Sequence, residues 1–353
     1  MCFFFMKKTN QIPTCYVLFS GGLDSRLALK IMQEQSEAKC NDAPKVVFSS
    51  EKKEEQKNKT RRTLTQKDNQ HNSKFKIIAL TFKFIFGSGC CQADCSFNFT
   101  QTQGIEHKII DCAQGKLFKE YLKIVAKPKH GHGSGINPCI DCRIFILNET
   151  KKLLKKNDFI VTGEVLNERP MSQYRKALEL IDKETKLEGK ILRPLSAKLF
   201  PKTKPEEAGL IDISKLFNIS GRSRKPQIEL ANHYKISYPT PAGGCLLCEK
   251  VFTERIKDLF KRKQLDKIAH TDIQLLKIGR HFMFPDYKII VGRNEKENIL
   301  LEKLKGKKEK VFTLKSQPGP SVLLQGKINE ESIRKAKEHV LRFSKCKDNV
   351  IEL

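Results

Sequence analysis

Two glycines flanked by hydroxyl side chains and a carboxylate form a short motif near the start of the chain. The motif consists of Ser20, Gly21, Gly22, Leu23, Asp24 and Ser25. The glycines let the backbone approach phosphate oxygens without a Cβ in the way, and successive N–H groups at a helix start bind an anion. Asp24 suits a Mg²⁺ ion that bridges phosphates. Because the lysine of a Walker loop is missing, kinase chemistry is disfavoured, and we expect the motif to bind Mg-ATP.

Four cysteines occur as two closely spaced pairs, Cys139 with Cys142 and Cys245 with Cys248. Thiols at a loop–helix junction ionise readily and can bind metal or exchange. In one interpretation, Cys139, Cys142 and Cys245 bind a [4Fe–4S] cluster, with Cys248 as a further candidate ligand. In a second, one cysteine carries a persulfide that another resolves. In a third, the two pairs close a zinc site, although their separation of roughly a hundred residues is unlike that of zinc ribbons.

The other cysteines are interpreted as structural thiols. They are Cys2, Cys15, Cys40, Cys90, Cys91, Cys95, Cys112 and Cys346. The chain starts with apolar residues followed by Lys7 and Lys8, the reverse of the order in a secretory signal, and no stretch is apolar for long enough to form a membrane helix. We therefore expect a cytoplasmic protein without membrane contact, whose thiols serve chemistry or metal binding rather than disulfides.

An excess of basic residues gives the chain a strongly positive charge. Lysine and arginine number 67 against 40 aspartates and glutamates, so the formal net charge is +27. Self-repulsion on this scale weakens folding, and we expect a polyanionic partner, of which nucleic acid is the leading class. A lysine-rich composition inherited from an AT-rich genome is the alternative. Arg222, Arg224 and Lys225 form a compact basic loop suited to phosphate.

The elements that must position these residues follow from the apolar pattern. Thr14–Ser20 is expected to be a buried strand and Leu23–Gln35 a helix, with the glycines between them. Further strands and helices are predicted at Lys76–Phe86, His107–Asp111, Gly115–Ala126, Cys142–Lys156 and Asp158–Thr162. Strands that alternate with helices indicate an α/β fold, with a mostly parallel sheet covered on both faces.

Two other stretches differ from this pattern. Residues from about Glu37 to Lys74 are polar and lack periodicity, which predicts a disordered insertion. From Gln274 onward, short segments indicate a small α+β domain: Tyr287–Val291, Lys310–Leu314, Ser321–Leu324 and a basic helix over Glu330–Phe343. The predicted parts are therefore an extension at 1–13, a catalytic domain at 14–235, a cysteine-bearing segment with a linker helix at 236–270, and a C-terminal domain at 271–353.

The glycine motif resembles the SGGxDS signature of PP-loop ATP pyrophosphatases. Members of that group cut ATP between the α and β phosphates and adenylate a carbonyl oxygen, so that a nucleophile can displace it as AMP. The resemblance implies an adenine-nucleotide alpha-hydrolase-like, Rossmann-like catalytic domain. ATP is expected to bind to the motif together with Gly163 and Glu164, since Glu164 follows a predicted strand, where it would orient the substrate or a metal.

Further blocks are similar to transfer-RNA thiolases of this group. Asn137–Arg143 is similar to their cysteine loop, and other blocks resemble the catalytic domain of 4-thiouridine synthases: Thr162–Leu166, Pro170–Gln173, Leu192–Leu195, Ser220–Gln227 and Pro241–Leu247. The chain departs from those synthases in showing no THUMP-like or rhodanese-like domain. Its cysteine set looks more like that of cluster-dependent 2-thiouridine enzymes.

The tail resembles an NFACT-type RNA-binding domain, on Ile289–Asn294 and Pro318–Leu324. Together the resemblances imply a tRNA sulfurtransferase with Asp24, Cys139, Cys142 and Cys245 as catalytic residues. RNA contacts are expected at Arg222, Arg224, Lys225 and Arg293. The sulfur donor would be sulfide, a cysteine desulfurase or a sulfur carrier. The alternatives are a PP-loop ligase or amidation enzyme, and a zinc-stapled RNA-binding protein without catalysis.

Overall fold

The computed structural model describes residues 12–37, 73–87, 93–239, 244–344 and 349–353. The chain forms two compact units, each assembled from segments that are distant in sequence. The first contains residues up to 82, 89–110 and 143–243; the second contains 83–88, 111–142 and 244–353. Most of the expected insertion at 37–74 lies outside the described residues.

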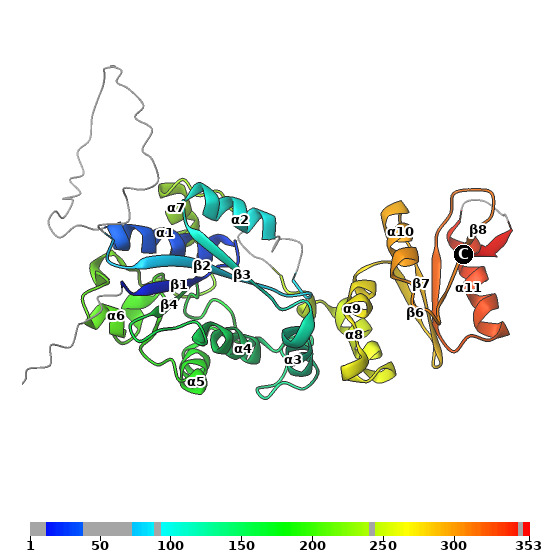
Figure 1. The fold of residues 1–353 in the computed structure, drawn as a ribbon, viewed down its shortest axis with the longest axis horizontal. Helices are drawn as coiled ribbons and strands as arrows, with labels where there is room; N and C mark the ends of the chain where they lie inside the picture. The colour runs from blue at the N-terminus through cyan, green and yellow to red at the C-terminus, as the bar shows by residue number, and fades with distance from the viewer. Residues whose placement is uncertain (1–11, 38–72, 88–92, 240–243, 345–348) are drawn as a thin grey trace, which may run out of the picture. The chain divides into compact units, whose positions relative to one another are not determined.

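A five-stranded sheet forms the centre of the first unit, in the order β3-β2-β1-β4-β5 (Figure 1). Its strands are β1 (Thr14–Leu18), β2 (Lys76–Lys83), β3 (Glu106–Asp111), β4 (Phe159–Thr162) and β5 (Ile191–Leu192). β1 pairs in parallel with β2 and β4, and β4 in parallel with β5. β4 is buried along its whole length, as expected for a strand covered on both faces. The predicted α/β fold class is confirmed.

Helices cover both faces of this sheet (Figure 1). One face carries α1 (Leu23–Glu37), α2 (Ala93–Thr102) and α7 (Lys225–His233), and the other carries α4 (Cys139–Lys151) and α5 (Arg175–Thr185). The strand order reverses between β1 and β4. In sheets of this kind ligands bind beyond the carboxyl ends of the strands at such a switch point.

α4 begins and ends earlier than the sequence suggested, because its start and its end are both fixed by local hydrogen bonds. The helix opens after Pro138, whose carbonyl accepts from the Cys142 N–H at 2.7 Å. Beyond Lys151 the chain turns, since the carbonyl of Thr150 accepts from the Leu153 N–H at 2.9 Å. The Asp158 carboxylate then accepts from the Lys155 N–H at 2.9 Å.

A second sheet of five strands, all paired antiparallel, lies in the second unit in the order β10-β8-β9-β7-β6. Its elements are β6 (Arg280–Met283), β7 (Tyr287–Val291), α10 (Glu295–Leu304), β8 (Lys310–Leu314), β9 (Val322–Gly326), α11 (Glu330–Phe343) and β10 (Val350–Glu352). The expected small α+β domain is therefore confirmed, with α10, β6 and β10 as additions.

Helices also cover both faces of this sheet. Ile289 and Val291 pack against α11 through Ala336 and Val340. Ile290 faces the opposite side and packs against Leu301 of α10 and Leu275 of α9 (His270–Lys277). This alternation follows from the two-residue period of a strand.

The cysteine segments also belong to the second unit, which the linear boundaries drawn from the sequence do not reflect. The Ile136 N–H donates to the Leu247 carbonyl at 2.9 Å, and the Leu246 N–H donates to the Phe86 carbonyl at 3.2 Å. A Cβ on Gly135 would lie 2.3 Å from the Leu247 oxygen, so only glycine allows this approach. These contacts join α3 (Gly115–Ala126) and its following loop to η4 (Leu246–Cys248) and α8 (Lys250–Arg262).

Within the described ranges, no helix has the length and apolar character needed to cross a bilayer.

Candidate active site

The phosphate motif lies between β1 and α1, where the sequence placed it. Gly21 has a positive φ of 78°, a conformation that favours glycine. The Ser20 hydroxyl accepts from the Gly22 N–H at 3.4 Å, and the Ser25 hydroxyl donates to the Gly22 carbonyl at 2.9 Å. The Leu23 side chain is buried in the core, so only its backbone is available at the helix start. The N–H groups at the start of α1 are the donors that an anion would use, and phosphate binding by the loop stays a prediction.

Gly163 follows β4 and packs directly on the first turn of α1. A Cβ at this position would lie 2.6 Å from the Asp24 carbonyl carbon and 2.7 Å from the Ser25 nitrogen. Real Cβ atoms do not approach backbone so closely, and any side chain would displace the loop. Gly163 thus shapes the phosphate loop by letting two backbone segments touch.

Asp24 combines one paired and one unpaired carboxylate oxygen. Its Oδ2 accepts from Arg224 at 3.0 Å, whereas its Oδ1 is buried and has no hydrogen-bond partner within the described part of the chain. Burial raises the pKa of Asp24, and the Arg224 guanidinium only partly opposes this. An unpaired carboxylate oxygen is a ligand that Mg²⁺ takes, so Asp24 fits the ion expected from the sequence.

Arg224 bridges Asp24 to a second carboxylate, Glu168, which the sequence did not single out. An Arg224 nitrogen donates to Glu168 Oε1 at 2.7 Å, and Gln227 donates to Glu168 Oε2 at 3.0 Å. Burial, with the nearby charge of Asp24, raises the pKa of Glu168 to about 7, against the opposing effect of Arg224. The loop after β1, the loop after β4 and the loop before α7 thus meet beyond the carboxyl ends of the strands.

Glu164 lies in a buried ion-pair network. Its carboxylate accepts from Arg143 at 3.2 Å and from Arg193 at 3.1 Å, and Arg193 also donates to both carboxylate oxygens of Asp182. Burial opposes ionisation of Glu164, but the two guanidinium groups outweigh it and lower its pKa. Both oxygens are therefore already occupied. The direct ATP contact expected of Glu164 stays a prediction, and the geometry gives the residue a supporting position behind Gly163.

The basic residues expected to contact RNA do not form one set. Arg222 and Lys225 are exposed in the loop before α7 and at its start, whereas Arg224 is held by the two carboxylates described above. Arg293 belongs to the second unit, where Glu297 accepts from its Nε at 3.0 Å. RNA contact by these residues stays a prediction.

In the second unit, two of the cysteine sulfurs accept hydrogen bonds. Asn137 Nδ2 lies 3.1 Å from Cys139 Sγ, and the Tyr121 hydroxyl lies 3.2 Å from Cys142 Sγ. Donors of this kind stabilise a thiolate or a sulfur that binds metal. Tyr121 is buried, and no sequence pattern pointed to it, because its contact with Cys142 joins residues that are 21 positions apart in the chain.

The segment that carries Cys245 lies beside the loop that leads to Cys139, because the Ile136 N–H donates to the Leu247 carbonyl. Burial raises the pKa of Cys245 to about 12, and the charges of Cys142, Cys248 and Cys139 add to the effect. Tyr121 shows the same grouping: after burial, the charge of Cys142, its hydrogen bond and the charges of Cys245 and Cys139 raise its pKa. Cys248 is exposed, and none of the four cysteines is in a disulfide. Cys139, Cys142, Cys245 and Cys248 thus belong to the same unit of the fold, although the two pairs are distant in sequence.

The side-chain spacing does not define a site for a single metal ion: the described residues contain no group of three or more Cys, His, Asp or Glu suited to one. Thiols are the ligands that an iron–sulfur cluster requires, and Cys139 and Cys142 each accept a hydrogen bond from a neighbouring side chain. Binding of a cluster by these residues stays a prediction.

The chain combines an α/β unit built on a mostly parallel five-stranded sheet with an α+β module built on an antiparallel one. Residues 279–351 of that module match the sequence family described as the NFACT protein RNA binding domain. No curated protein sequence matches the chain.

Solved structures show distant likenesses. One is the U34-tRNA thiolase NcsA from Methanococcus maripaludis with its [4Fe-4S] cluster, with 15% identity, a TM-score of 0.34 and coverage of 76% of this chain and 72% of that chain. Another is an NMN synthetase from Francisella tularensis, with 12% identity, a TM-score of 0.23 and coverage of 65% of this chain and 89% of that chain. Neither likeness assigns an activity to this chain.

Proposed function

We propose that the chain is an ATP-dependent tRNA sulfurtransferase that adenylates a uridine carbonyl and replaces its oxygen with sulfur. The observation that carries the proposal is the grouping of Cys139, Cys142 and Cys245 in a protein that also has a phosphate loop. Hydrogen bonds from Asn137 and Tyr121 to two of the sulfurs support a chemical role for the thiols.

In the first step, the uridine carbonyl oxygen attacks the α-phosphorus of ATP, and pyrophosphate leaves. The N–H groups at the start of α1 and the Ser20 and Ser25 hydroxyls would hold the phosphates. Asp24 would bind Mg²⁺, which when bound stabilises the charge of the phosphate oxygens. Arg224 donates to the Asp24 carboxylate and would pair with phosphate once Asp24 binds the metal.

In the second step, a sulfur nucleophile attacks the activated uridine carbon, and AMP leaves with the former carbonyl oxygen. Cys139, Cys142 and Cys245 would hold an iron–sulfur cluster, which when bound supplies a position for inorganic sulfide. Tyr121 and Asn137 would fix two of the thiolates by donating hydrogen bonds. A persulfide on one cysteine would deliver sulfur by an alternative route, with a second cysteine closing a disulfide as it leaves.

The partner of the proposed reaction is RNA. The match of residues 279–351 to an RNA-binding domain and the formal net charge of +27 both favour it.

The experiment is a single-turnover reaction under anaerobic conditions, with reconstituted protein, an unmodified tRNA transcript, Mg-ATP and sulfide. Pyrophosphate release and thiolated nucleosides are measured separately. We expect Asp24→Asn to stop both, and Cys139→Ser to keep pyrophosphate release while losing thiouridine. Cys112→Ala is the matched control, since Cys112 is a buried thiol outside the group.

Two results would redirect the assignment. Thiouridine formation by Cys139→Ser at the normal rate would remove the thiols from sulfur transfer. ATP-dependent transfer of ammonia instead of sulfide, detected as an aminated product, would make the protein an amidation enzyme.

A further inference from the structure

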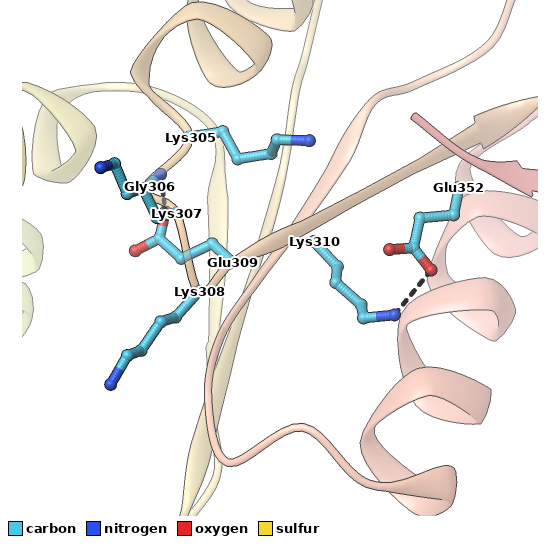
Figure 2. Close-up of a pocket in the computed structure, with 7 residues that line it drawn as sticks. All are labelled: Lys305, Gly306, Lys307, Lys308, Glu309, Lys310 and Glu352. Carbon is cyan, nitrogen blue, oxygen red and sulfur yellow. Dashed lines mark hydrogen bonds and ion pairs between the residues drawn. The ribbon is translucent and has the colours of Figure 1, made fainter.

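The turn that joins α10 to β8 carries four lysines in six residues. Lys305, Lys307, Lys308 and Lys310 line a hollow of about 520 Å³, together with Gly306, Glu309 and Glu352 (Figure 2). Small-molecule pockets of this size are usually lined by apolar and aromatic side chains. This one is lined by charged side chains, which suits a polyanion and not an apolar ligand.

The four lysines divide into two held and two unpaired side chains. Lys305 Nζ donates to the Leu353 carbonyl at 2.8 Å, and Lys310 Nζ pairs with Glu352 at 2.8 Å. Lys307 and Lys308 are exposed, and neither has an acidic partner in the part of the chain that the structure describes. Figure 2 shows Lys308 directed away from the Lys310–Glu352 pair. Two ammonium groups are therefore available to a ligand.

Glu309 fixes the backbone of the turn that carries the four lysines. One carboxylate oxygen accepts from the Gly306 N–H at 2.7 Å, and the other accepts from Gln325 of β9 at 2.6 Å. The Glu309 N–H in turn donates to the Gly306 carbonyl at 3.1 Å. Because the backbone is already ordered, less conformational entropy is lost when the lysines engage a ligand.

We propose that Lys307 and Lys308 bind phosphates of the RNA backbone, and that Glu309 holds the turn in position for this contact. The proposal rests on RNA being the partner, as in the proposed function. It adds the residues and the chemistry of the contact: two ammonium–phosphate pairs that position the RNA without reading its sequence.

The test measures binding of a tRNA transcript to the full chain over a series of salt concentrations, without ATP or sulfide. For the double variant Lys307→Ala/Lys308→Ala, we expect at least about 10-fold weaker binding at low salt. The slope of log affinity against log salt should become shallower by about 1.4 to 1.8, which corresponds to two lost phosphate contacts. Lys307→Arg/Lys308→Arg should retain the affinity and the slope, since the charges remain.

The matched control is Lys296→Ala/Lys337→Ala. These lysines are exposed on α10 and α11 of the same domain, and the control loses the same charge. An equal loss of affinity in this control would mean that binding follows net charge alone, and an unchanged slope in the turn variant would mean that its lysines do not touch phosphate. Either result overturns the proposal.

Gln325→Ala tests the turn without changing any charge, because it removes the side chain that donates to Glu309. We expect several-fold weaker binding with an unchanged salt slope, because the number of phosphate contacts stays the same; unchanged affinity would overturn the role given to Glu309. No step of thiolation enters these binding measurements. If RNA binding depends on the lysines but no thiouridine forms in the activity assay, the proposed sulfurtransferase activity is wrong and the proposed RNA contact stands.

Discussion

Gly163 and Asp24 meet backbone to backbone: a Cβ on Gly163 would lie 2.6 Å from the carbonyl carbon of Asp24. The contact joins the end of β4 to the start of α1, across the point where the strand order reverses. It sets the position of the loop whose N–H groups would hold phosphate.

We expect Gly163→Ala to lower the free energy of unfolding by about 1 to 3 kcal/mol, because the methyl group cannot be accommodated without moving the backbone. ATP affinity should fall as well, since the loop moves with it. Denaturant unfolding and ATP titration check both effects. Gly244→Ala serves as the control, because a Cβ there meets nothing within 4 Å. Wild-type ATP affinity in Gly163→Ala would show that the loop does not depend on the contact.

Asp24→Asn should reduce ATP-dependent pyrophosphate release at least about 100-fold, in the range seen when one electrostatic group is removed from an active site. The reason is that the amide keeps the shape but loses the charge that Mg²⁺ requires. Asp212→Asn, on an exposed residue of the same unit that caps a short turn, should leave the rate unchanged. A rate within about threefold of wild type would contradict the role given to Asp24.

Glu168 should make stability depend on pH. Its pKa is raised to about 7 in the folded protein, against about 4.3 in an unfolded chain. The folded state therefore binds the Glu168 proton more tightly than the unfolded state does. Protonation of Glu168 contributes its full stabilisation below about pH 4, and this stabilisation is lost as pH rises towards 7. We expect Glu168→Gln to remove up to about 3 kcal/mol of this pH dependence. Unfolding free energies at pH 5 and pH 7.5 test it, and equal pH dependence in both proteins would show that Glu168 titrates normally.

Tyr121→Phe should slow alkylation of Cys142 in the metal-free protein about 2- to 10-fold near neutral pH. The hydroxyl that donates to the sulfur is lost, so the thiolate is less populated. Mass spectrometry of the labelled peptides measures the rate. Tyr16→Phe, which removes another buried hydroxyl in the first unit, provides the comparison. Unaltered labelling of Cys142 in Tyr121→Phe would mean that the hydrogen bond does not favour the thiolate.

Arg193→Met should cost about 3 kcal/mol of stability, because it removes the shared partner of the buried Glu164 and the partly buried Asp182 and leaves Glu164 with Arg143 alone. Arg222→Met, on an exposed side chain, should change stability by less than about 0.5 kcal/mol. Chemical denaturation compares the two variants. Similar stabilities would show that the network contributes no more than a surface charge.

Local patterns in the sequence predicted much of the fold. The helix at Gly115–Ala126, the strands at Tyr287–Val291 and Lys310–Leu314 and the helix at Glu330–Phe343 have the bounds expected from their apolar spacing. α2 was missed, because its sequence lacks a clear apolar stripe. The short strands β5, β6 and β10 depend on pairing with neighbours, which a local pattern does not encode.

The phosphate loop was predictable for the same reason, since its glycines, hydroxyls and carboxylate are contiguous. Glu168 was not, because its partner Arg224 lies 56 residues away in sequence and their pairing depends on the folded sheet. Its place shortly after a predicted strand was the one signal that could have identified it. Likewise, the hydrogen bond from Tyr121 to Cys142 forms only in the folded protein, and no local sequence motif predicts it.

Helices cover both faces of the C-terminal sheet, and this limits the ways in which the domain can contact RNA bases. Modules that distinguish bases commonly stack them on aromatic side chains of an open sheet face. In the described sheet, α11 covers one face and α9 with α10 covers the other, so stacking on the sheet is not available. The domain would therefore hold RNA through the edges, turns and helices that surround the sheet, and not through stacking of bases on the sheet itself.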